Sequence, residues 1–451
     1  MNKNRQTISQ ILANWIALAD IADIPKTEIA LAKLRILDTV GLIFSGKDSL
    51  QSKSIIEYAK RYGSVGNCTL IGNGRLTISP QVAAMAHGAI AHSQDLDDTF
   101  PESIVHPGSC IIPTALAVGE EINASSDVIL TAITVGYEVA GRIGAIFKRQ
   151  LHKRGFHSSG VVGPFSAAAT AGKLLGLSGV QISNAFGLAG SMSGGLLAFM
   201  EDGSWSKSLH LGWAAHSGIV AAQLSAGGYT GPRSVLDGRN NIFKSFSEIP
   251  HPSWDEISSD LGCNWSGGNA LFKVYPCAHV IHPYIDAALS IMSSVPFVEC
   301  NIARIICHVP PWSVPIVLEP KEKKQRPANE GEAIGSMPFI LAAALSAGKT
   351  SLITKSFGEL ATEETYALAG KVDYQIDASL GEDFSGSITI KFVNGEHLNR
   401  LAKTVQLSKK VIEEKFFINA SNFLNKDQIN NLKKSIDGMP LNRFILKIGA
   451  Y

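Results

Sequence analysis

The chain has 451 residues, of which 45% are hydrophobic and 18% are charged. This length exceeds what one hydrophobic core usually supports, so we expect two domains or one large one, and the composition excludes a disordered chain. The 40 basic and 39 acidic residues leave a net charge of +1. This balance disfavours nucleic acid or an anionic membrane as the main partner.

The six cysteines are scattered, and no two have the C-x-x-C spacing. This argues against a zinc ribbon, a thioredoxin-type motif and an iron–sulfur site. In the N-terminal segment, Asp20 and Asp23 interrupt the apolar run, which suits an amphipathic helix better than a signal peptide. We therefore expect a cytoplasmic protein without a membrane span.

Helical patterns dominate the first part of the chain. A helix is expected over residues 27–44, which follow Pro25 and carry an apolar stripe. Residues 109–150 and 161–230 are rich in Ala, Gly and Ser. Because small side chains let helices approach closely, these stretches predict a compact bundle of buried helices.

A helix is also predicted over residues 82–98, and polar side chains gather at its end. His92, Asp95 and Thr99 are three and four residues apart, so they would share one face of this helix. His106 would follow on a loop. The pattern indicates an acid/base cluster at a helix end, and the alternative is a capped, solvated helix terminus.

Two further clusters carry reactive side chains. His157 precedes a predicted helix that Ser158 or Ser159 would cap, and the free N–H groups of a helix N-terminus favour an anion. Lys207 and His210 lie one helical turn apart among small residues, where a lysine is costly unless it meets an anion. A plain capping loop and a lysine that reaches solvent are the simpler alternatives.

From about Lys273 onward the pattern changes to alternating strands and helices, typical of an α/β segment of roughly 125 residues. Asn394-Gly395 predicts a β-hairpin, and the polar run 321–332 predicts a surface loop. Lys273 would lie at the junction between domains, where small-molecule sites often form.

The predicted elements give a mainly α fold. We expect a large all-helical domain made of residues 1–268 and 400–451, and a smaller α/β domain made of residues 269–399. The last residues return to helical character and would pack back on the first domain.

Side chains from these clusters would make one coherent site. The lysines could hold carboxylates, and the histidines could remove and return protons near neutral pH. Negative charge that develops on carboxylate oxygens needs cations, so the set favours proton abstraction next to a carboxylate. The residues are Asp95, Thr99, His106, His157, Lys207 and Lys273.

The order of these clusters resembles the MmgE/PrpD family, which includes 2-methylcitrate dehydratase, cis-aconitate decarboxylase and iminodisuccinate epimerase. The resemblance covers most of residues 10–400. It implies a helical domain with a smaller α/β lid domain, a homodimer, and a polycarboxylate site without metal or cofactor. The motifs that carry it are AHSQDLDDTF followed by HPG, GYEVAGRIG, RGFHSSGVVGPFSAAATAGKLLGL, DGSWSKSLHLGWAAHSG, GGYTGPRSVLDG and KVYPCAHVIHPYIDA.

The resemblance also implies roles for the six residues. Asp95, His106 and His157 would be catalytic, and Thr99, Lys207 and Lys273 would bind the substrate. His87 and His92 are left with structural roles.

The activity expected is that of a cofactor-independent lyase that dehydrates a citrate- or 2-methylcitrate-like 2-hydroxy acid. The alternatives are epimerisation of an imino- or amino-dicarboxylate, decarboxylation of cis-aconitate, and a protein that only binds polycarboxylates. Family members often carry an aromatic hydroxyl at the position of Phe339, so decarboxylation ranks last among the reactions.

Overall fold

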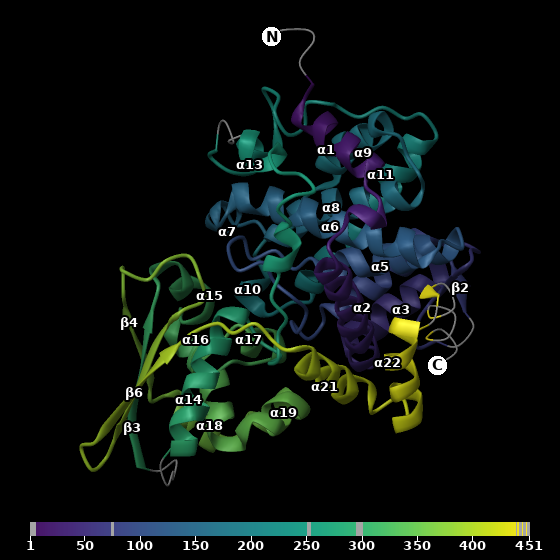
Figure 1. Ribbon diagram of the computed structural model, residues 1–451. Helices are drawn as coiled ribbons and strands as arrows, with labels where there is room; N and C mark the ends of the chain where they lie inside the picture. Colours follow the sequence, from purple (N-terminus) through teal and green to yellow (C-terminus); the bar gives the residue numbers. More distant parts are fainter. Residues whose placement is uncertain are drawn as a thin grey trace.

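The computed structural model is mainly α and describes residues 6–73, 76–249, 254–294 and 301–438, together with Pro440, Leu441, Phe444 and Ile448. A larger part is a bundle of helices, and a smaller part sets helices beside a four-stranded sheet (Figure 1). The helices of the larger part are α1 (Ile8–Leu18), α2 (Lys26–Gly46), α3 (Leu50–Tyr62), α4 (Pro80–Ala91), α5 (Gly108–Glu121), α6 (Ser126–Phe147), α7 (Gln150–Lys153), α8 (Ser158–Leu174), α9 (Gly179–Met192), α10 (Phe199–Asp202), α11 (Ser206–Ala226), α12 (Ile242–Phe246) and α13 (Trp254–Ser258). A two-residue ladder pairs β1 (Cys68–Thr69) with β2 (Thr77–Ile78).

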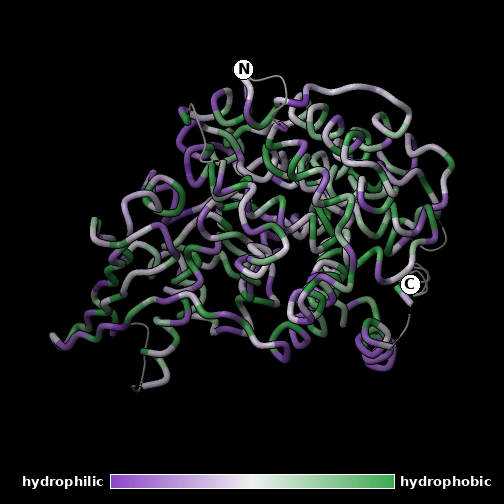
Figure 2. Tube along the Cα trace, turned by 45° about the horizontal axis from the view of Figure 1, so that its top comes forward, coloured by the Kyte–Doolittle hydropathy of each residue, from purple (hydrophilic) through white to green (hydrophobic). Residues whose placement is uncertain are grey.

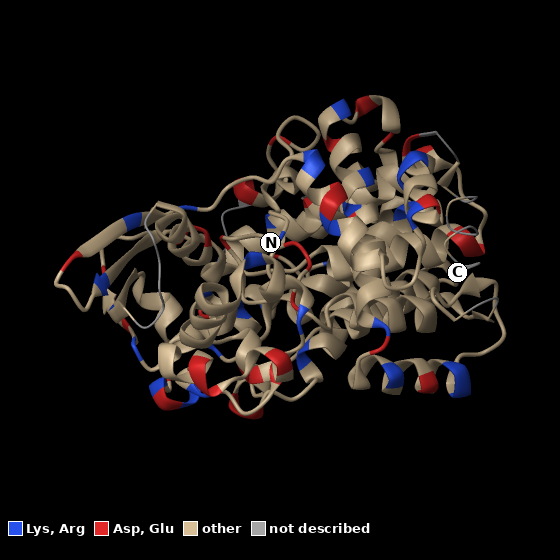
Figure 3. Ribbon diagram, turned by 90° about the horizontal axis from the view of Figure 1, so that it is seen from below, with Lys and Arg blue, Asp and Glu red and all other residues tan. Residues whose placement is uncertain are grey.

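Small residues let the central helices of the larger part pack closely. A Cβ at Gly88 of α4 would lie 3.0 Å from the Cα of Gly212 of α11, so neither position has room for a side chain. Gly218 of α11 meets Ala167 of α8 in the same way. The prediction of a compact bundle is confirmed, and Figure 2 shows hydrophobic stretches concentrated along its central helices. Basic and acidic residues are interspersed along the ribbon in Figure 3.

The hydrophobicity of α6 reflects its position in the core of the larger part. By length and composition alone, α6 and α18 (Met337–Thr354) could each cross a membrane. In α6, however, 94% of the most apolar stretch is buried inside the protein. Its apolar surface is therefore used for packing against neighbouring helices.

The smaller part is built around a sheet of order β4-β3-β5-β6. Strand β3 (Ile302–Val309) runs parallel to β4 (Val372–Ile376) and antiparallel to β5 (Gly386–Phe392), and β5 runs antiparallel to β6 (His397–Ala402). The predicted hairpin joins β5 and β6 and is confirmed, with Gly395 at a φ of 90° that favours glycine. The helices of this part are α14 (His282–Ser294), α15 (Val314–Val317), α16 (Lys321–Gln325), α17 (Glu330–Ile334), α18, α19 (Phe357–Leu360) and α20 (Glu363–Ala369).

The C-terminal segment crosses from β6 back to the larger part as α21 (Lys409–Ala420) and α22 (Lys426–Gly438) (Figure 1). Phe416 and Ala420 of α21 belong to the same buried cluster as the larger bundle. Buried apolar side chains from Tyr275 to Ala402 form a second cluster. A domain boundary at residue 268 and a lid role for the smaller part stay proposals.

The helix predicted over residues 82–98 is wrong in its second half. Helix α4 ends at Ala91, and the chain then turns, with Asp95 in the left-handed region at a φ of 51°. Thr99 and Leu271 exchange two backbone hydrogen bonds of 2.9 Å. Contacts with distant segments therefore override the helical pattern, and His92, Asp95 and Thr99 do not share a helix face.

Candidate active site

A pocket lies between the larger and the smaller part of the protein. One wall comes from the segment after α4 and the N-terminal ends of α8 and α11, and the other from residues 278–280 and 312–335 of the smaller part. All six side chains predicted from the sequence line this pocket. They are Asp95, Thr99, His106, His157, Lys207 and Lys273.

Asp95 holds both lysines of the pocket. Its Oδ2 lies 2.6 Å from Lys207 Nζ and its Oδ1 lies 2.6 Å from Lys273 Nζ, which also donates to the Asp95 backbone carbonyl at 2.8 Å. Burial alone would raise the pKa of Asp95, but the two ammonium groups outweigh it and hold this pKa well below its usual value. Asp95 is therefore a carboxylate that places two cations side by side.

His106 is fixed by contacts on its Nδ1 side. Nδ1 lies 3.1 Å from both the hydroxyl of Thr99 and the backbone carbonyl of Asp98, and the His106 backbone N–H donates to Ser159 at 2.9 Å. Burial, followed by the nearby charge of Lys273, lowers the pKa of His106 well below its usual value. The ring is therefore neutral at pH 7 and can accept a proton.

His157 is the N-cap residue of α8, and no side-chain cap bond is present among the described residues there. The prediction that Ser158 or Ser159 caps this helix is wrong, since the Ser158 hydroxyl contacts His152 Nδ1 at 2.9 Å. His157 Nδ1 lies 3.1 Å from His210 Nδ1. Burial, with a contribution from His210, lowers the pKa of His157 well below its usual value. The His157 ring is thus neutral and is oriented by a second histidine.

His92 lies in the pocket wall, although the sequence left it with a structural role. Its Nδ1 is 2.8 Å from Asp97 Oδ1, while its buried Nε2 has no hydrogen-bond partner among the residues that the structure describes. Burial would raise the pKa of Asp97, but His92 and His106 outweigh it and lower that pKa. His87 is different: it accepts a hydrogen bond from the Ile71 N–H at 2.9 Å and has the structural role expected.

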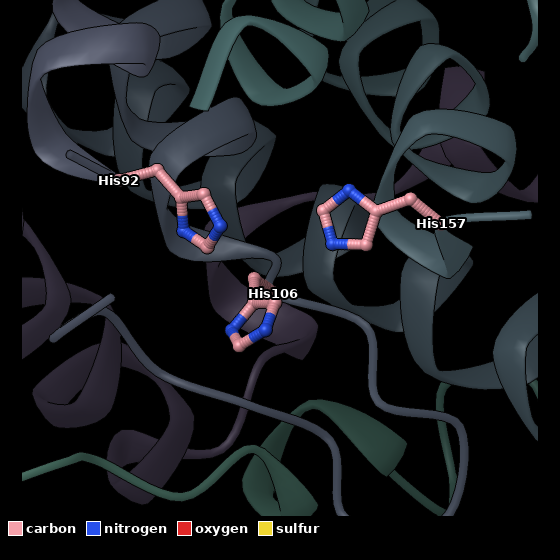
Figure 4. A group of neighbouring side chains, drawn as sticks. All are labelled: His92, His106 and His157. Carbon is pink, nitrogen blue, oxygen red and sulfur yellow. The ribbon is translucent and has the colours of Figure 1, made fainter. Parts of the chain in front are cut away.

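The three pocket histidines turn toward one another (Figure 4). His92, His106 and His157 each offer a ring nitrogen, and these three atoms lie within 4.8 Å of one another. They could therefore hold a metal ion. Sequence analysis missed this grouping because the three residues come from separate segments.

Asp98 holds the loop between α4 and α5 on the side that faces away from the pocket. It accepts hydrogen bonds from the Gly108 N–H at 2.8 Å and the Tyr137 hydroxyl at 2.7 Å, with Arg35 Nε at 3.9 Å. Burial raises the pKa of Asp98 to about 6. These contacts fix the loop that carries His106.

The opposite wall includes residues that the sequence did not reveal. The run 321–332, predicted as a surface loop, instead forms α16 and the start of α17 and lines the pocket. Lys324 is buried and donates to the backbone carbonyls of Ile316 and Gly335 at 2.8 and 2.7 Å, and burial lowers its pKa to about 8. Lys323 donates to the backbone carbonyl of Glu201 in the larger part. A polar run has the same composition in a loop and in a pocket wall, which explains the error.

Phe339 lies outside this pocket. It is buried in α18, with its ring centroid 5.6 Å from that of Phe357 and 5.9 Å from that of Tyr366. The interpretation that Phe339 removes a proton donor from the site is therefore wrong. Phe339 therefore gives no reason to rank decarboxylation last among the candidate reactions.

Models of two protein domains match the chain. The MmgE/PrpD N-terminal domain matches residues 10–255, and the MmgE/PrpD C-terminal domain matches residues 275–437. The chain belongs to the MmgE/PrpD family. The family resemblance of its motifs is thereby confirmed.

Several curated relatives of this MmgE/PrpD chain share a name. Human cis-aconitate decarboxylase is 28% identical over 457 residues, which cover 96% of the chain and 92% of the human protein. The cis-aconitate decarboxylase of Aspergillus terreus is 29% identical over 302 residues, 64% of the chain. The cis-aconitate decarboxylase-like protein oryM of Aspergillus oryzae is 29% identical over 299 residues, 63% of the chain. The chain spans 61% of the length of each of these two fungal relatives.

Proposed function

We propose that this MmgE/PrpD protein is a cofactor-independent lyase that acts on a small polycarboxylate. The observation that carries the proposal is the pairing of Asp95 with Lys207 and Lys273, each at 2.6 Å, beside two neutral histidines. A substrate carboxylate would share these two cations with Asp95. The histidines would then move protons at the adjacent carbon.

Each group has a part in the proposed chemistry. Lys207 and Lys273 stabilise negative charge that develops on the substrate carboxylates, in a buried site where such charge is costly without a cation. His106 and His157 accept and return protons through the ring nitrogens opposite their hydrogen-bonded Nδ1 atoms. Thr99 binds a substrate oxygen, and Asp95 keeps the lysines in place.

Decarboxylation of cis-aconitate is the first candidate reaction. The names of the relatives support it, and Phe339 no longer counts against it. The bond to one carboxylate carbon breaks, carbon dioxide leaves, and the electron pair moves through the alkene to a carbon that takes a proton from an imidazolium. That imidazolium forms when the negative charge of the bound substrate favours protonation of a pocket histidine.

Dehydration of a citrate- or 2-methylcitrate-like acid is the second candidate. The neutral state of His106 and His157 favours it, because a neutral imidazole can remove the proton next to a carboxylate. The other histidine, once protonated, gives a proton to the leaving hydroxyl. Epimerisation of iminodisuccinate would use the same removal and return of a proton without elimination.

A panel of four compounds followed by NMR in deuterated water tests these candidates. Release of carbon dioxide from cis-aconitate identifies decarboxylation, whereas an alkene formed from citrate or 2-methylcitrate identifies dehydration. Deuterium in iminodisuccinate without an alkene identifies epimerisation. If the folded protein turns over none of the four, the lyase proposal is overturned, and a raised melting temperature with the same compounds would indicate a binding protein.

We also propose that the protein is a homodimer. Leu209, Trp213 and Leu224 on α11 are 43%, 50% and 39% exposed and recur at helical spacing, a pattern typical of a protein contact. Light scattering of the purified protein would give twice the chain mass. Trp213→Glu should shift the mass toward the monomer, and an unchanged dimer would place the contact elsewhere.

The lid role of the smaller part is likewise a proposal. It is supported by contacts between the two parts beside the pocket, where Asn329 Nδ2 donates to the Asp202 backbone carbonyl at 3.0 Å. The cytoplasmic location stays a prediction from the sequence.

A further inference from the structure

Three histidines from different segments point their free ring edges into one small space (Figure 4). His92 follows the last residue of α4, His106 lies on the loop before α5, and His157 precedes α8. One nitrogen from each ring lies within 4.8 Å of the other two. All three side chains are buried, so water does not compete freely for these nitrogens.

Contacts on the Nδ1 side of each ring hold the three histidines in place. The Asp97 carboxylate lies 2.8 Å from His92 Nδ1, and the Asp98 backbone carbonyl lies 3.1 Å from His106 Nδ1. Because a carboxylate and a carbonyl only accept, each Nδ1 carries the proton, and the lone pair is on Nε2. His157 Nδ1 lies 3.1 Å from His210 Nδ1, and in the tautomer in which His157 donates the proton of this contact, the lone pair of its Nε2 is available to a metal ion.

We propose that His92, His106 and His157 bind a divalent transition-metal ion such as Zn²⁺, and that the bound ion blocks turnover in this pocket. Neutral imidazole is a preferred ligand of Zn²⁺, Co²⁺, Ni²⁺ and Cu²⁺. A carboxylate or carbonyl on the opposite ring nitrogen is the usual outer contact of a histidine ligand. A water molecule would complete a four-coordinate site.

The charge around the three rings permits a cation. Lys207 and Lys273 would repel it, but Asp95 sits between them and Asp97 lies behind His92, so two carboxylates balance two ammonium groups.

Inhibition follows from the proposed function, whereas metal binding does not depend on it. A metal-bound Nε2 has no lone pair left to take up a proton, so His106 and His157 could not act as bases. The ion would be an inhibitor of the proposed reaction and not its cofactor. Removing it with a chelator should restore turnover.

Metal binding is measured first on the protein without polycarboxylates, which chelate metals themselves. Zn²⁺ is titrated in competition with a chromophoric chelator, and Co²⁺ is followed by its visible absorption. We expect one ion per chain and an affinity that falls about 100-fold or more in His92→Gln, because one of three ligands is lost. Asp97→Asn, which keeps all three ligands, should weaken binding about 10-fold. The control is His216→Gln, whose ring stacks on Trp213 at 4.9 Å and does not line the pocket.

The outcomes separate cleanly. Equal Zn²⁺ binding by the wild type, His92→Gln and Asp97→Asn, or no stoichiometric binding by the wild type, overturns the site. Stoichiometric binding that leaves turnover unchanged overturns the inhibition. Failure of the proposed function shows itself separately, as absence of turnover in protein freed of metal. Circular dichroism of each variant establishes that the fold is retained.

Discussion

The segment from His92 to Gly108 has two sides, and buried charge is held differently on each. On the pocket side, Asp95 pairs with Lys207 from α11 and Lys273 from the start of the smaller part. On the rear side, Asp98 is held by Gly108, Tyr137 and Arg35, all within the larger bundle. Burial raises the pKa of Asp98, whereas two cations keep that of Asp95 low.

A second rear contact reaches the same segment. Lys415 of α21 pairs with Asp38 of α2 at 2.6 Å and donates to the backbone carbonyl of Leu96 at 2.7 Å. The rear partners thus tie the segment to the core helices. In the proposed function, Lys207 and Lys273 on the pocket side pair with a substrate carboxylate as well as with Asp95. This difference indicates that rear substitutions act on stability, whereas pocket substitutions act on turnover.

Lys415→Ala tests the rear side of the segment. Among the substitutions proposed here, we expect it to lower the free energy of unfolding most. It leaves the buried Asp38 carboxylate without its partner, and burial already raises the pKa of Asp38 despite Lys415. We expect the free energy of unfolding to fall by about 3–5 kcal/mol, the usual cost of removing one member of a buried pair. Urea unfolding measures it.

The double variant Asp38→Asn with Lys415→Met is the control for that substitution. It removes both charges, so it should recover much of the lost stability. A loss below about 1 kcal/mol in Lys415→Ala would show that the pair contributes no more than an exposed one.

Lys207→Ala tests the pocket side. Turnover of the preferred substrate should fall about 10²–10³-fold, because one cation for the developing charge is lost. The free energy of unfolding should change by less than about 1 kcal/mol, since Asp95 keeps Lys273 at 2.6 Å. Steady-state kinetics and urea unfolding give the two values.

Lys33→Ala is the matched control, because this lysine pairs with Asp437 at the surface, at 3.4 Å. It should change neither turnover nor stability measurably. If Lys207→Ala lowered stability as much as Lys415→Ala, the distinction between the two sides would not hold.

The sequence could predict six reactive side chains of the pocket because its motifs keep them beside small residues. The glycines and alanines of 161–230 predicted close helix packing, and the helices α8 and α11 do bring His157 and Lys207 to one cavity. The mainly α class followed from the same composition. The two domain matches also bear out the family that the motifs suggested.

Other features depend on contacts between distant segments. The left-handed turn at Asp95 is held by Lys273, 178 residues later, so a local periodicity predicted a helix instead. Nothing local distinguishes His92, whose Nε2 has no hydrogen-bond partner within the described part of the chain, from His87, whose Nε2 accepts a hydrogen bond. The pocket wall at 321–332 has the composition of a loop. Only the packing of the two parts assigns these residues to the site.

Asp98→Asn tests the rear side of the segment through the pH dependence of stability. The folded-state pKa of Asp98 is raised to about 6, above the usual value of 3.8, so its protonated form stabilises the fold. That contribution is complete below about pH 4 and is lost as pH rises through about 6. At about 1.4 kcal/mol per pKa unit it amounts to at most about 3 kcal/mol.

The measurement for Asp98→Asn is urea unfolding of wild type and variant from pH 4 to pH 7. The stability of the wild type relative to the variant should fall across this range, because asparagine does not titrate. The exposed Asp437→Asn serves as the control and should run parallel to the wild type. A difference that stayed constant, or grew with pH, would mean that Asp98 is charged throughout.

Phe339→Tyr should have the smallest effect, and it tests a residue that belongs to neither side of the segment. Its ring packs on Phe357 and Tyr366 in the core of the smaller part, so an added hydroxyl would be buried away from the pocket. Turnover and the ratio of carbon dioxide release to alkene formation should not change, while the free energy of unfolding falls by about 1 kcal/mol. A raised rate of carbon dioxide release would contradict this, since it would require the new hydroxyl to reach the substrate. Position 339 would then act on the chemistry through the smaller part, and the pocket side would extend beyond the lysines that pair with Asp95.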